Sequence, residues 1–229
     1  MLSVIVPVHN EAKILASTIR ALSAAMDALG DYEIIISEDG STDGTPRIAK
    51  GLASGNVRVI SSGKRLGRGL SLSNAMRAAR GDIVIYMDAD LAADLGSTRR
   101  LVSEIEKGAD ISTGSRLLPG SEVVGRSRLR DFFSRGYNIF LRLLFRTSVR
   151  DHQCGFKAFR KSSILPLVAE VKDRHWFWDS ELMIRAQDRG MKIAEIPIRW
   201  TDRKESGVKL ESDIIYMGLA AVRLRLALR

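Results

Sequence analysis

Asp82-Ile-Val-Ile-Tyr-Met-Asp-Ala-Asp90 is the stretch that decides the fold. It begins as a short apolar run, which is typical of a buried strand, and it ends on two carboxylates with one small residue between them. Two earlier apolar runs, at residues 2–8 and 32–37, also lead into polar and acidic residues. Segments of helical length separate the runs, and this alternation predicts an α/β fold with a mainly parallel central sheet flanked by helices.

The alternation extends along the chain without an internal repeat or a linker-like stretch. The pattern predicts strands at 2–8, 32–37, 57–60, 82–87, 111–115 and 192–198. It predicts helices at 12–29, 45–53, 70–79, 95–107, 129–145, 176–189 and 211–229, with a loop at 117–128. We expect residues 1–210 to form one domain, and residues 211–229 to form a C-terminal amphipathic helix that belongs to it or associates with a membrane.

Composition limits the classes of protein that the chain can represent. Of its 229 residues, 45% are hydrophobic and 28% are charged, so it can bury a core and is not expected to be disordered. The formal net charge of +9 suits a nucleotide, a phosphorylated lipid, an acidic membrane or a nucleic acid as partner. A basic surface that serves only solubility is the alternative. The lone Cys154 excludes an intrachain disulfide and a cysteine zinc cluster.

No stretch of the sequence has the length of a membrane span. The apolar start of the chain is interrupted by Pro7 and His9, which argues against a signal peptide. The longest apolar stretch near the C-terminus, residues 214–222, falls short of the roughly 20 residues that cross a bilayer. With the lone cysteine, these features lead us to expect a cytoplasmic protein that is not integral to a membrane.

Three groups of polar and acidic residues follow predicted strands. They are Asn10 with Glu11, then Asp39, then Asp88 with Asp90. The carboxyl ends of parallel strands open on one edge of a sheet, where ligands bind, so we expect the three groups to converge. Taken singly, Asp39 fits a turn with a helix cap, and the last pair fits an acidic helix N-terminus. Convergence favours a ligand site over these structural roles.

Asp88 and Asp90 have the spacing of a divalent cation site. At positions i and i+2 of an extended strand end, both side chains project to the same side. Mg²⁺ and Mn²⁺ prefer carboxylates together with phosphate oxygens, and such a cation neutralises the charge that develops on a departing diphosphate. The pair therefore predicts that one carboxylate holds Mg²⁺ or Mn²⁺ beside a nucleotide diphosphate, and that the other holds the sugar or a metal-bound water.

One ordered set of motifs resembles the inverting family-2 glycosyltransferases. It consists of Val-Ile-Val-Pro7-Val-His-Asn10-Glu11, Glu-Asp39-Gly-Ser41-Thr-Asp43 and Met-Asp88-Ala-Asp90. The resemblance implies the GT-A nucleotide-diphospho-sugar transferase fold, with residues 1–210 as the catalytic domain and with metal held by Asp88 and Asp90. The residues that it implies for donor nucleotide binding are Pro7, Val8, Asn10, Glu11, Asp39, Ser41, Lys64, Asp88, Ala89, Asp90 and Lys209.

The second half of the chain narrows the resemblance to dolichyl-phosphate sugar synthases. The motifs that carry it are Arg150-Asp-His-Gln-Cys-Gly-Phe-Lys157, Trp176-Phe-Trp-Asp-Ser-Glu181 and Ile193-Ala-Glu-Ile-Pro197. The first motif is closest to the glucosyl branch, and the mannosyl branch matches nearly as well. The resemblance implies a metal-dependent hexosyltransferase that moves a hexose from UDP-glucose or GDP-mannose to dolichyl or polyprenyl phosphate with inversion.

Further residue roles follow from this resemblance. The residues with catalytic roles would be Asp90, Asp179 and Arg203, and those in contact with the acceptor phosphate would be Arg116, Arg130 and Ser134. Arg203 and Lys209 would close over the pyrophosphate. Asp179 stands where relatives that act on hydroxyls keep their base. Here we expect it to orient the acceptor, because a phosphate monoester, with a second pKa of about 6, is ionised near neutral pH.

The charge pattern supports a phosphate acceptor independently. Five arginines follow the fifth predicted strand closely: Arg116, Arg126, Arg128, Arg130 and Arg135. The planar guanidinium group suits bidentate phosphate binding, although for any single arginine a solvated basic loop is an equally good interpretation. A further basic motif, Gly67-Arg-Gly69, precedes a predicted helix and is only a weak phosphate-binding signal.

Residues 129–146 combine aromatic bulk with four arginines, and their apolar positions include 132, 133, 139, 140, 143 and 144. A helix with this pattern either lies in a membrane interface or packs its apolar face on the domain core. Residues 214–228 have a similar pattern. A long-chain acceptor needs a landing surface, so we expect at least one of these helices to touch lipid, peripherally, at the cytoplasmic face of a membrane. The sequence leaves open a separate membrane subunit as a partner.

Two other functions fit parts of the pattern. A family-2 glycosyltransferase that acts on a sugar hydroxyl, in polysaccharide or glycolipid assembly, would need Asp179 as an essential base. A nucleic-acid-binding module would account for the positive charge, but three acidic groups at one sheet edge would repel a phosphate backbone. We therefore expect a nucleotide sugar, a polyprenyl phosphate and a membrane surface as partners, and no nucleic acid.

Overall fold

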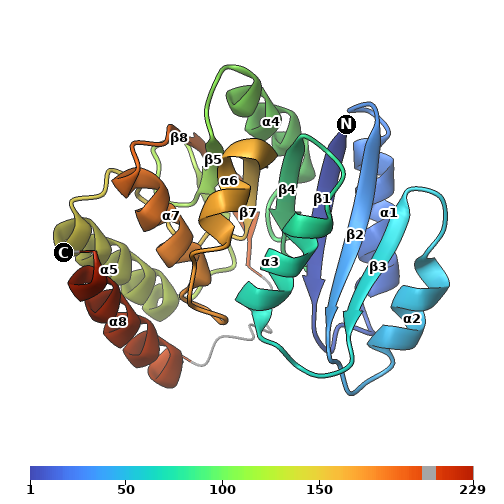
Figure 1. Cartoon of the computed structure of the whole chain (residues 1–229), viewed down its shortest axis with the longest axis horizontal. Helices are drawn as coiled ribbons and strands as arrows, with labels where there is room; N and C mark the ends of the chain where they lie inside the picture. The colour runs from blue at the N-terminus through green and yellow to red at the C-terminus, as the bar shows by residue number, and fades with distance from the viewer. Residues whose placement is uncertain (203–209, 229) are drawn as a thin grey trace.

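The computed structural model describes residues 1–202 and 210–228, with a seven-stranded sheet at its centre (Figure 1). The strand order is β3-β2-β1-β4-β7-β5-β8. These strands are β1 (Leu2–Val8), β2 (Tyr32–Asp39), β3 (Val57–Ser62), β4 (Ile83–Met87), β5 (Ile111–Ser115), β7 (Phe156–Arg160) and β8 (Ile193–Pro197). Two short strands, β6 (Glu122–Val124) and β9 (Arg199–Thr201), form a separate parallel pair.

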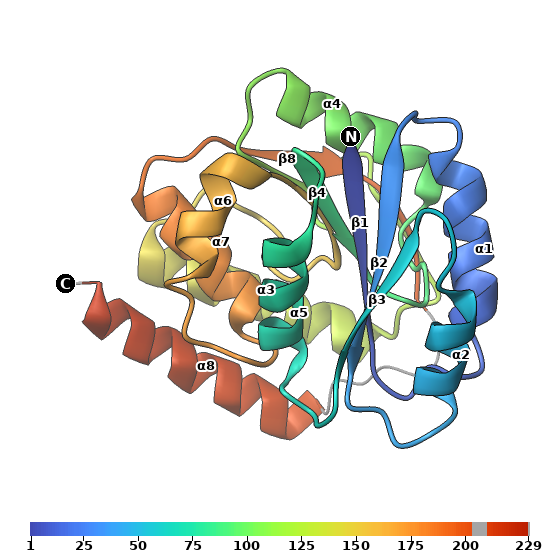
Figure 2. The ribbon, with the colours of Figure 1, turned by 45° about the vertical axis from the view of Figure 1, so that its right-hand side comes forward.

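Helices cover both faces of the sheet (Figure 2). One face carries α1 (Leu15–Met26), α2 (Thr45–Leu52) and α4 (Thr98–Glu106), the last preceded by the 3₁₀ turn η1 (Leu95–Ser97). The other face carries α3 (Arg68–Ala78), α6 (Lys161–Val168) and α7 (Trp178–Asp188). In β1, Val4 and Val6 belong to the first core and Ile5 to the second. A strand buried on both faces therefore appears in the sequence as a continuous apolar run.

The predicted α/β fold with a mainly parallel sheet is confirmed, and β7 is its main correction. β7 runs antiparallel between β4 and β5, where the sequence pattern predicted no strand. Its apolar pattern is interrupted by Lys157, which is completely buried. Lysine is rarely buried unless it is paired, so hydrophobicity does not reveal such a strand. The pattern also missed α6 and β9, and it assigned β6 to a loop.

Helices α5 (Arg128–Phe145) and α8 (Leu210–Ala227) lie side by side at one end of the molecule (Figure 1). They share a third apolar core with residues at the start of α7 and within it. The face of α5 that turns inward carries Ser134, Tyr137, Asn138 and Leu141. The face that turns outward exposes the apolar residues Leu129, Phe132, Phe133, Ile139, Phe140 and Leu143, with Arg128, Arg135 and Arg142 among them. Of the apolar positions singled out in the sequence, 144 packs against the third core, whereas 132, 133, 139, 140 and 143 are exposed, so these five do not pack on the domain core.

Buried polar contacts fix α5 to the loop that precedes β7. The side-chain oxygen of Asn138 accepts hydrogen bonds from the backbone N–H and from the ring Nδ1 of His152, each at 2.9 Å. Because the Asn138 side-chain oxygen can only accept hydrogen bonds, the ring proton of His152 lies on Nδ1. The buried Nε2 of His152 has no partner among the described residues. Burial is the main reason why the pKa of His152 is lowered to about 3.

We expect the stability of the fold to depend on pH through His152. The unfolded chain takes up a proton at this residue at about pH 6.5, whereas the folded chain does so only at about pH 3. Between these values the unfolded state binds more protons, so stability falls as pH falls, by up to about 1.4 kcal/mol per pH unit from this residue. Urea unfolding of wild type and His152→Gln between about pH 7 and pH 5 measures this slope. If the stability of His152→Gln falls with pH as steeply as that of wild type, His152 is not the source of the pH dependence.

Candidate active site

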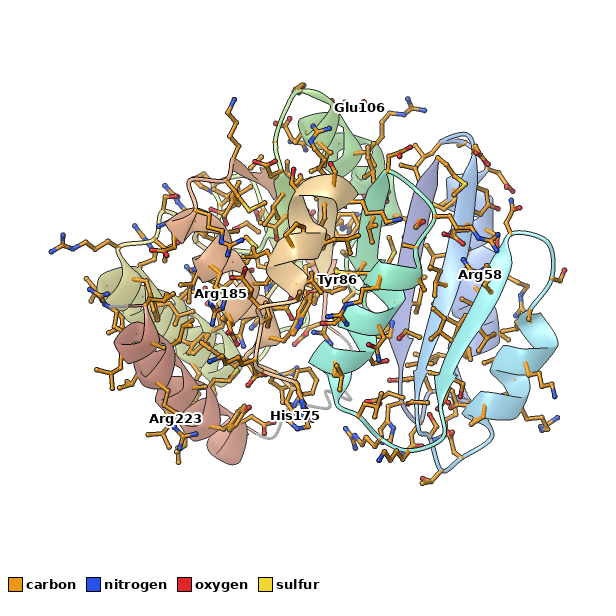
Figure 3. All side chains as sticks on the ribbon, viewed as in Figure 1. Arg58, Tyr86, Glu106, His175, Arg185 and Arg223 are labelled. Carbon is orange, nitrogen blue, oxygen red and sulfur yellow. The ribbon has the colours of Figure 1, made fainter. Side chains whose placement is uncertain are left out.

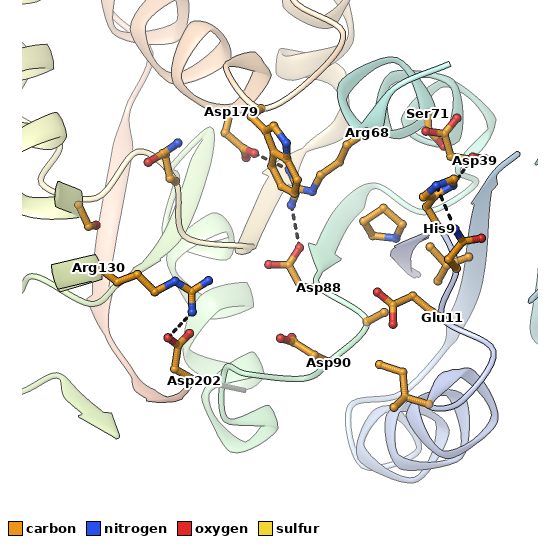
Figure 4. A pocket seen from close by; sticks show the side chains of 18 of the residues that line it. His9, Glu11, Asp39, Arg68, Ser71, Asp88, Asp90, Arg130, Asp179 and Asp202 are labelled. Carbon is orange, nitrogen blue, oxygen red and sulfur yellow. Dashed lines mark hydrogen bonds and ion pairs between the residues drawn. The ribbon is translucent and has the colours of Figure 1, made fainter. Parts of the chain in front are cut away.

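A cavity of about 720 Å³ opens at the carboxyl ends of β1, β2 and β4 (Figure 4). Residues from both halves of the chain line it. The lining residues that were predicted from the sequence are Pro7, Val8, Asn10, Glu11, Asp39, Asp88, Ala89, Asp90, Arg116, Arg130, Ser134 and Asp179. Ser41 and Lys64 do not line the cavity. Arg203 and Lys209, which were predicted to close over the pyrophosphate, lie outside the described residues.

Asp88 and Asp90 follow β4 directly, and both carboxylates face the cavity (Figure 4). The Asp88 backbone N–H donates to the Gly155 carbonyl at 3.1 Å. A Cβ atom on Gly155 would lie 1.8 Å from Asp88 Oδ2, so only glycine leaves room for this carboxylate. Asp90 Oδ1 accepts a hydrogen bond from the Ala92 N–H at 3.1 Å. The three groups that were expected to converge thus all line one cavity, but Asp88 and Asp90 lie at the turn after β4 and not on an extended strand end.

Arg68, which the sequence marked only as part of a weak Gly-Arg-Gly motif, bridges the two sides of the site. Its guanidinium donates to Asp88 Oδ1 and to Asp179 Oδ2, each at 2.7 Å. Its central carbon lies 5.2 Å from the ring centre of Tyr86 and 5.6 Å from that of Trp176. Such contacts with ring faces add a cation–π attraction that holds the group in place.

The two glycines beside Arg68 explain the motif. Gly67 has a φ of 100°, and a Cβ atom there would lie 2.4 Å from the Arg174 carbonyl oxygen. A Cβ atom on Gly69 would lie 2.5 Å from the Trp178 side chain. The start of α3 can approach the segment before α7 this closely only because both residues lack a side chain. The Gly-Arg-Gly pattern thus places Arg68 between β4 and α7.

Asp179 is held as a carboxylate by charges on both sides. Its Oδ1 lies 3.0 Å from Lys157 Nζ and accepts a hydrogen bond from the Tyr86 hydroxyl, while its Oδ2 pairs with Arg68. Burial alone would raise the pKa of Asp179, but Lys157 and Arg68 outweigh it and lower the pKa below its ordinary value. A carboxyl group in this environment holds cations in position and is a poor proton acceptor at neutral pH.

Two predicted acceptor arginines have carboxylate partners that the sequence did not reveal. Asp151 accepts from Arg116 Nε at 2.7 Å and from Arg116 Nη2 at 2.8 Å, a bidentate pair. Burial opposes the charge of Asp151, but the Arg116 guanidinium outweighs burial and holds the pKa of Asp151 well below its ordinary value. Arg130 Nη1 donates to Asp202 at 2.7 Å (Figure 4). Both guanidinium groups are therefore oriented by the protein, with other N–H groups left for a ligand.

Residues predicted to bind the nucleotide also stabilise the loops at the cavity rim. The carboxylate of Asp39 accepts hydrogen bonds from the backbone N–H groups of Leu66 at 2.6 Å and Gly67 at 3.0 Å. Ser41 Oγ accepts one from the Asn10 N–H at 2.9 Å. Asn10 has a φ of 59°, which is uncommon outside glycine and turns the chain after β1 along the cavity. Asp39 lines the cavity, whereas Ser41 lies outside the lining and contacts the backbone of Asn10.

The donor chemistry of the site fits a hard divalent cation. Within residues 1–202 and 210–228, no group of three or more His, Cys, Asp and Glu side chains forms a complete metal cage. Two carboxylates beside an open cavity instead match Mg²⁺ or Mn²⁺, because such ions accept one or two carboxylates and keep other positions for phosphate oxygens and water. Asp88 and Asp90 are the residues that would hold the ion.

The fold is that of the GT-A glycosyltransferases. Glucosyl-3-phosphoglycerate synthase from Mycobacterium tuberculosis, solved with Mn²⁺, UDP and glucosyl-3-phosphoglycerate, superposes with a TM-score of 0.73. That comparison covers 99% of this chain and 80% of the synthase, at 23% sequence identity. A second structure of the synthase, with Mn²⁺, UDP and phosphoglyceric acid, gives a TM-score of 0.72 at 23% identity, over 98% of this chain and 78% of the synthase.

The sequence comparison gives the family. Residues 3–165 match the model described as glycosyl transferase family 2, and the chain belongs to this family. Glycosyltransferase AglD of Haloferax volcanii is 41% identical over 227 residues, which are 96% of this chain and 36% of AglD. The dolichyl-phosphate beta-glucosyltransferase of Saccharomyces cerevisiae is 30% identical over 248 residues, 99% of this chain and 74% of that protein. The chain thus spans only part of the length of each relative.

We expect the substitution Gly155→Ala to disturb Asp88. The added Cβ would lie 1.8 Å from Asp88 Oδ2, so the carboxylate must rotate away from Arg68. Overpacking of this kind costs about 1–3 kcal/mol, which urea unfolding measures. Gly136→Ala is the matched control, because Gly136 lies within α5 and a Cβ added there would meet open space, and helical glycine is less stable than alanine by roughly 0.5–1 kcal/mol. Equal effects of the two substitutions would show that Gly155 does not constrain Asp88.

Proposed function

We propose that the chain transfers a hexose from a nucleotide sugar to a polyprenyl phosphate, with inversion and with a divalent cation, at a membrane surface. The observation that carries the proposal is the make-up of one cavity, whose lining combines the carboxylates of Asp88 and Asp90 with the guanidinium groups of Arg116 and Arg130. A diphosphate held through a cation and a phosphate held by arginines would face each other across the space for a sugar.

The part of the cavity that would hold the nucleotide sugar can neutralise the charge of the leaving group. A cation between Asp88 and Asp90 would neutralise the negative charge that develops on the departing nucleoside diphosphate. Arg68 lies against Asp88 and lines the same cavity, so it provides a second positive charge beside the diphosphate. Pro7, Val8 and Asp39, at the ends of β1 and β2, would hold the nucleoside at the opposite end of the donor.

The acceptor side favours a phosphate nucleophile. A phosphate oxygen attacks the anomeric carbon, a new C–O bond forms, and the diphosphate leaves with the electron pair of the broken bond. One in-line displacement inverts the configuration. A phosphate monoester is largely dianionic at neutral pH, since its second pKa is about 6, and no base has to remove a proton. Asp179, whose pKa is lowered by Lys157 and Arg68, is suited to orienting Arg68 and not to abstracting a proton.

The environment of Asp179 is also the argument against the rival acceptor. Transfer to a sugar hydroxyl needs a general base with a pKa near the working pH. Asp179 is the residue that would have to serve, and its two oxygens are already engaged by Lys157, Tyr86 and Arg68. We therefore favour the phosphate acceptor.

The outward face of α5 supports a lipid-bound acceptor. Phe132 is 71% exposed and Leu143 is 77% exposed, and both belong to the apolar face described above. The neighbouring α8 adds Ile215, Leu219 and Leu226 to the exposed apolar surface. None of the helices in the described part of the chain has the length and hydropathy of a membrane span. Contact with lipid would therefore be made by helices that lie along the surface.

The position of this face relative to the cavity connects the two parts of the proposal. Phe133, Ser134 and Tyr137 of α5, together with Ile214 and Met217 of α8, also line the cavity. A phosphate bound there would have its hydrocarbon chain leaving along these two helices. Relatives named dolichyl-phosphate beta-glucosyltransferase give independent support for such an acceptor. The cytoplasmic side of the membrane and a separate membrane subunit stay predictions from the sequence.

We expect Asp88→Ala and Asp90→Ala each to reduce transfer by about a hundredfold or more, because a departing diphosphate loses the charge neutralisation that a cation supplies. The assay incubates farnesyl phosphate and Mn²⁺ or Mg²⁺ with UDP-glucose or GDP-mannose and measures product mass. Asp82→Ala is the matched control, since the Asp82 side chain is 94% exposed just before β4. Full activity in either cavity variant, or no product from any wild-type combination, would refute the proposal.

We expect Leu143→Glu to weaken binding to phospholipid vesicles by about tenfold or more, because burial of a leucine side chain is worth roughly 1.5–3 kcal/mol. Sedimentation with vesicles of phosphatidylcholine and phosphatidylglycerol measures the bound fraction. Arg100→Gln, on the exposed surface of α4, makes the same change in net charge away from α5 and should bind like wild type. Equal binding by Leu143→Glu and wild type would exclude this face as the contact.

A further inference from the structure

Three arginines line the acceptor side of the cavity, and two of them have a carboxylate partner. Asp151 holds Arg116, and Asp202 holds Arg130. Arg126 also lines the cavity, but no hydrogen bond or ion pair joins it to another residue in the described part of the chain. Its Nε atom is buried without a partner. Arg126 therefore brings a positive charge to the cavity without a counter-charge bonded to it.

The backbone around Arg126 is held at both ends. On one side, β6 pairs with β9, and the Asp202 N–H donates to the Val124 carbonyl at 2.8 Å. On the other side, Ser127 caps α5 by accepting a hydrogen bond from the Arg130 N–H at 3.3 Å. Gly125, with a φ of 78°, makes the turn between them. Arg126 is thus placed by secondary structure on either side of it.

The local charges favour an anion at this position. Burial is the main reason why the pKa of Arg126 is lowered to about 10, and the neighbouring Arg116 lowers it further, while Asp151 and Asp202 oppose the effect. The group stays protonated at neutral pH, so a partly buried positive charge persists without a bonded partner. Burying such a charge is costly, and unpaired charges of this kind are typical of sites that bind a charged ligand. The N-terminus of α5, which follows directly, adds partial positive charge.

We propose that Arg126 binds the acceptor phosphate beside Arg116 and Arg130, and that this phosphate is the anion that bonds to it, since no carboxylate among the described residues does. The proposal rests on the acceptor assigned above. Asp151 and Asp202 are bonded to Arg116 and Arg130, so neither is left to form an ion pair with Arg126. A phosphate monoester can form that ion pair, whereas a neutral hydroxyl cannot. Arg126 is therefore a residue that determines specificity for a phosphorylated acceptor.

Binding of farnesyl phosphate to the full chain tests this role, measured by isothermal titration calorimetry. We expect Arg126→Gln to weaken binding by about ten- to hundredfold, the effect of losing a charge-assisted hydrogen bond, and Arg126→Lys to weaken it less. Arg128→Gln is the matched control, because Arg128 is an exposed neighbour that does not line the cavity. Binding of UDP or GDP should be the same in all variants.

Thermal unfolding separates ligand binding from a structural role. Removal of an unpaired, partly buried cation should leave the melting temperature of Arg126→Gln unchanged or higher. A structural role would lower it. Unchanged affinity for farnesyl phosphate in Arg126→Gln, or an equal loss of affinity for the nucleotide, would overturn the assignment.

Glycerol 3-phosphate and farnesol distinguish the phosphate group from the lipid. Weaker binding of glycerol 3-phosphate by Arg126→Gln, with no binding of farnesyl phosphate by wild type, would support the phosphate site and refute the lipid acceptor of the proposed function. Equal binding of farnesol and farnesyl phosphate by wild type would overturn the role of Arg126. So would a failure of wild type to bind either phosphate.

Discussion

The ion pairs of Arg68 hold the two sides of the site together. One side is the end of β4, where Asp88 accepts from this guanidinium, and the other is the start of α7, where Asp179 accepts from it. Lys157 of β7 donates a hydrogen bond to the other oxygen of Asp179, the one that does not contact Arg68. Each charge is compensated by its neighbour, and loss of one partner from a buried pair typically costs about 3–5 kcal/mol. The geometry of the cavity therefore depends on this alternation of charges.

The antiparallel strand β7 is what brings these groups together. Its register places Lys157 opposite Tyr86, which lies in the middle of the molecule (Figure 3). The glycine just before the strand leaves room for the Asp88 carboxylate. The loop before it supplies Asp151 to Arg116 and His152 to Asn138. One short strand and its loop thus leave room for the Asp88 carboxylate, carry the buried Lys157 and orient Arg116.

The side chains that line the cavity are more evident from the sequence than the residues that hold them in place. Asp88, Asp90 and Asp39 were predictable because each follows an apolar strand, and parallel strands share one open edge. Asp151, Asp202 and Lys157 were not assigned these roles, because their partners lie far away in the sequence and only the packed chain brings them within hydrogen-bond distance. The nucleotide-binding role of Ser41 stays a prediction; its side chain accepts a hydrogen bond from the Asn10 N–H.

The alternation of apolar runs and helical segments by itself determined the α/β class, the parallel direction of the first strands and the edge of the sheet at which the acidic residues meet. These features follow from local periodicity and from the chemistry of strand ends, so neighbouring residues suffice to specify them. The tertiary structure alone decided where β7 inserts, which carboxylate orients each arginine and which face of α5 turns outward. A helix with apolar residues on one face can bury that face on any apolar surface. Whether the apolar face turns inward or outward therefore depends on which neighbouring elements already fill the core.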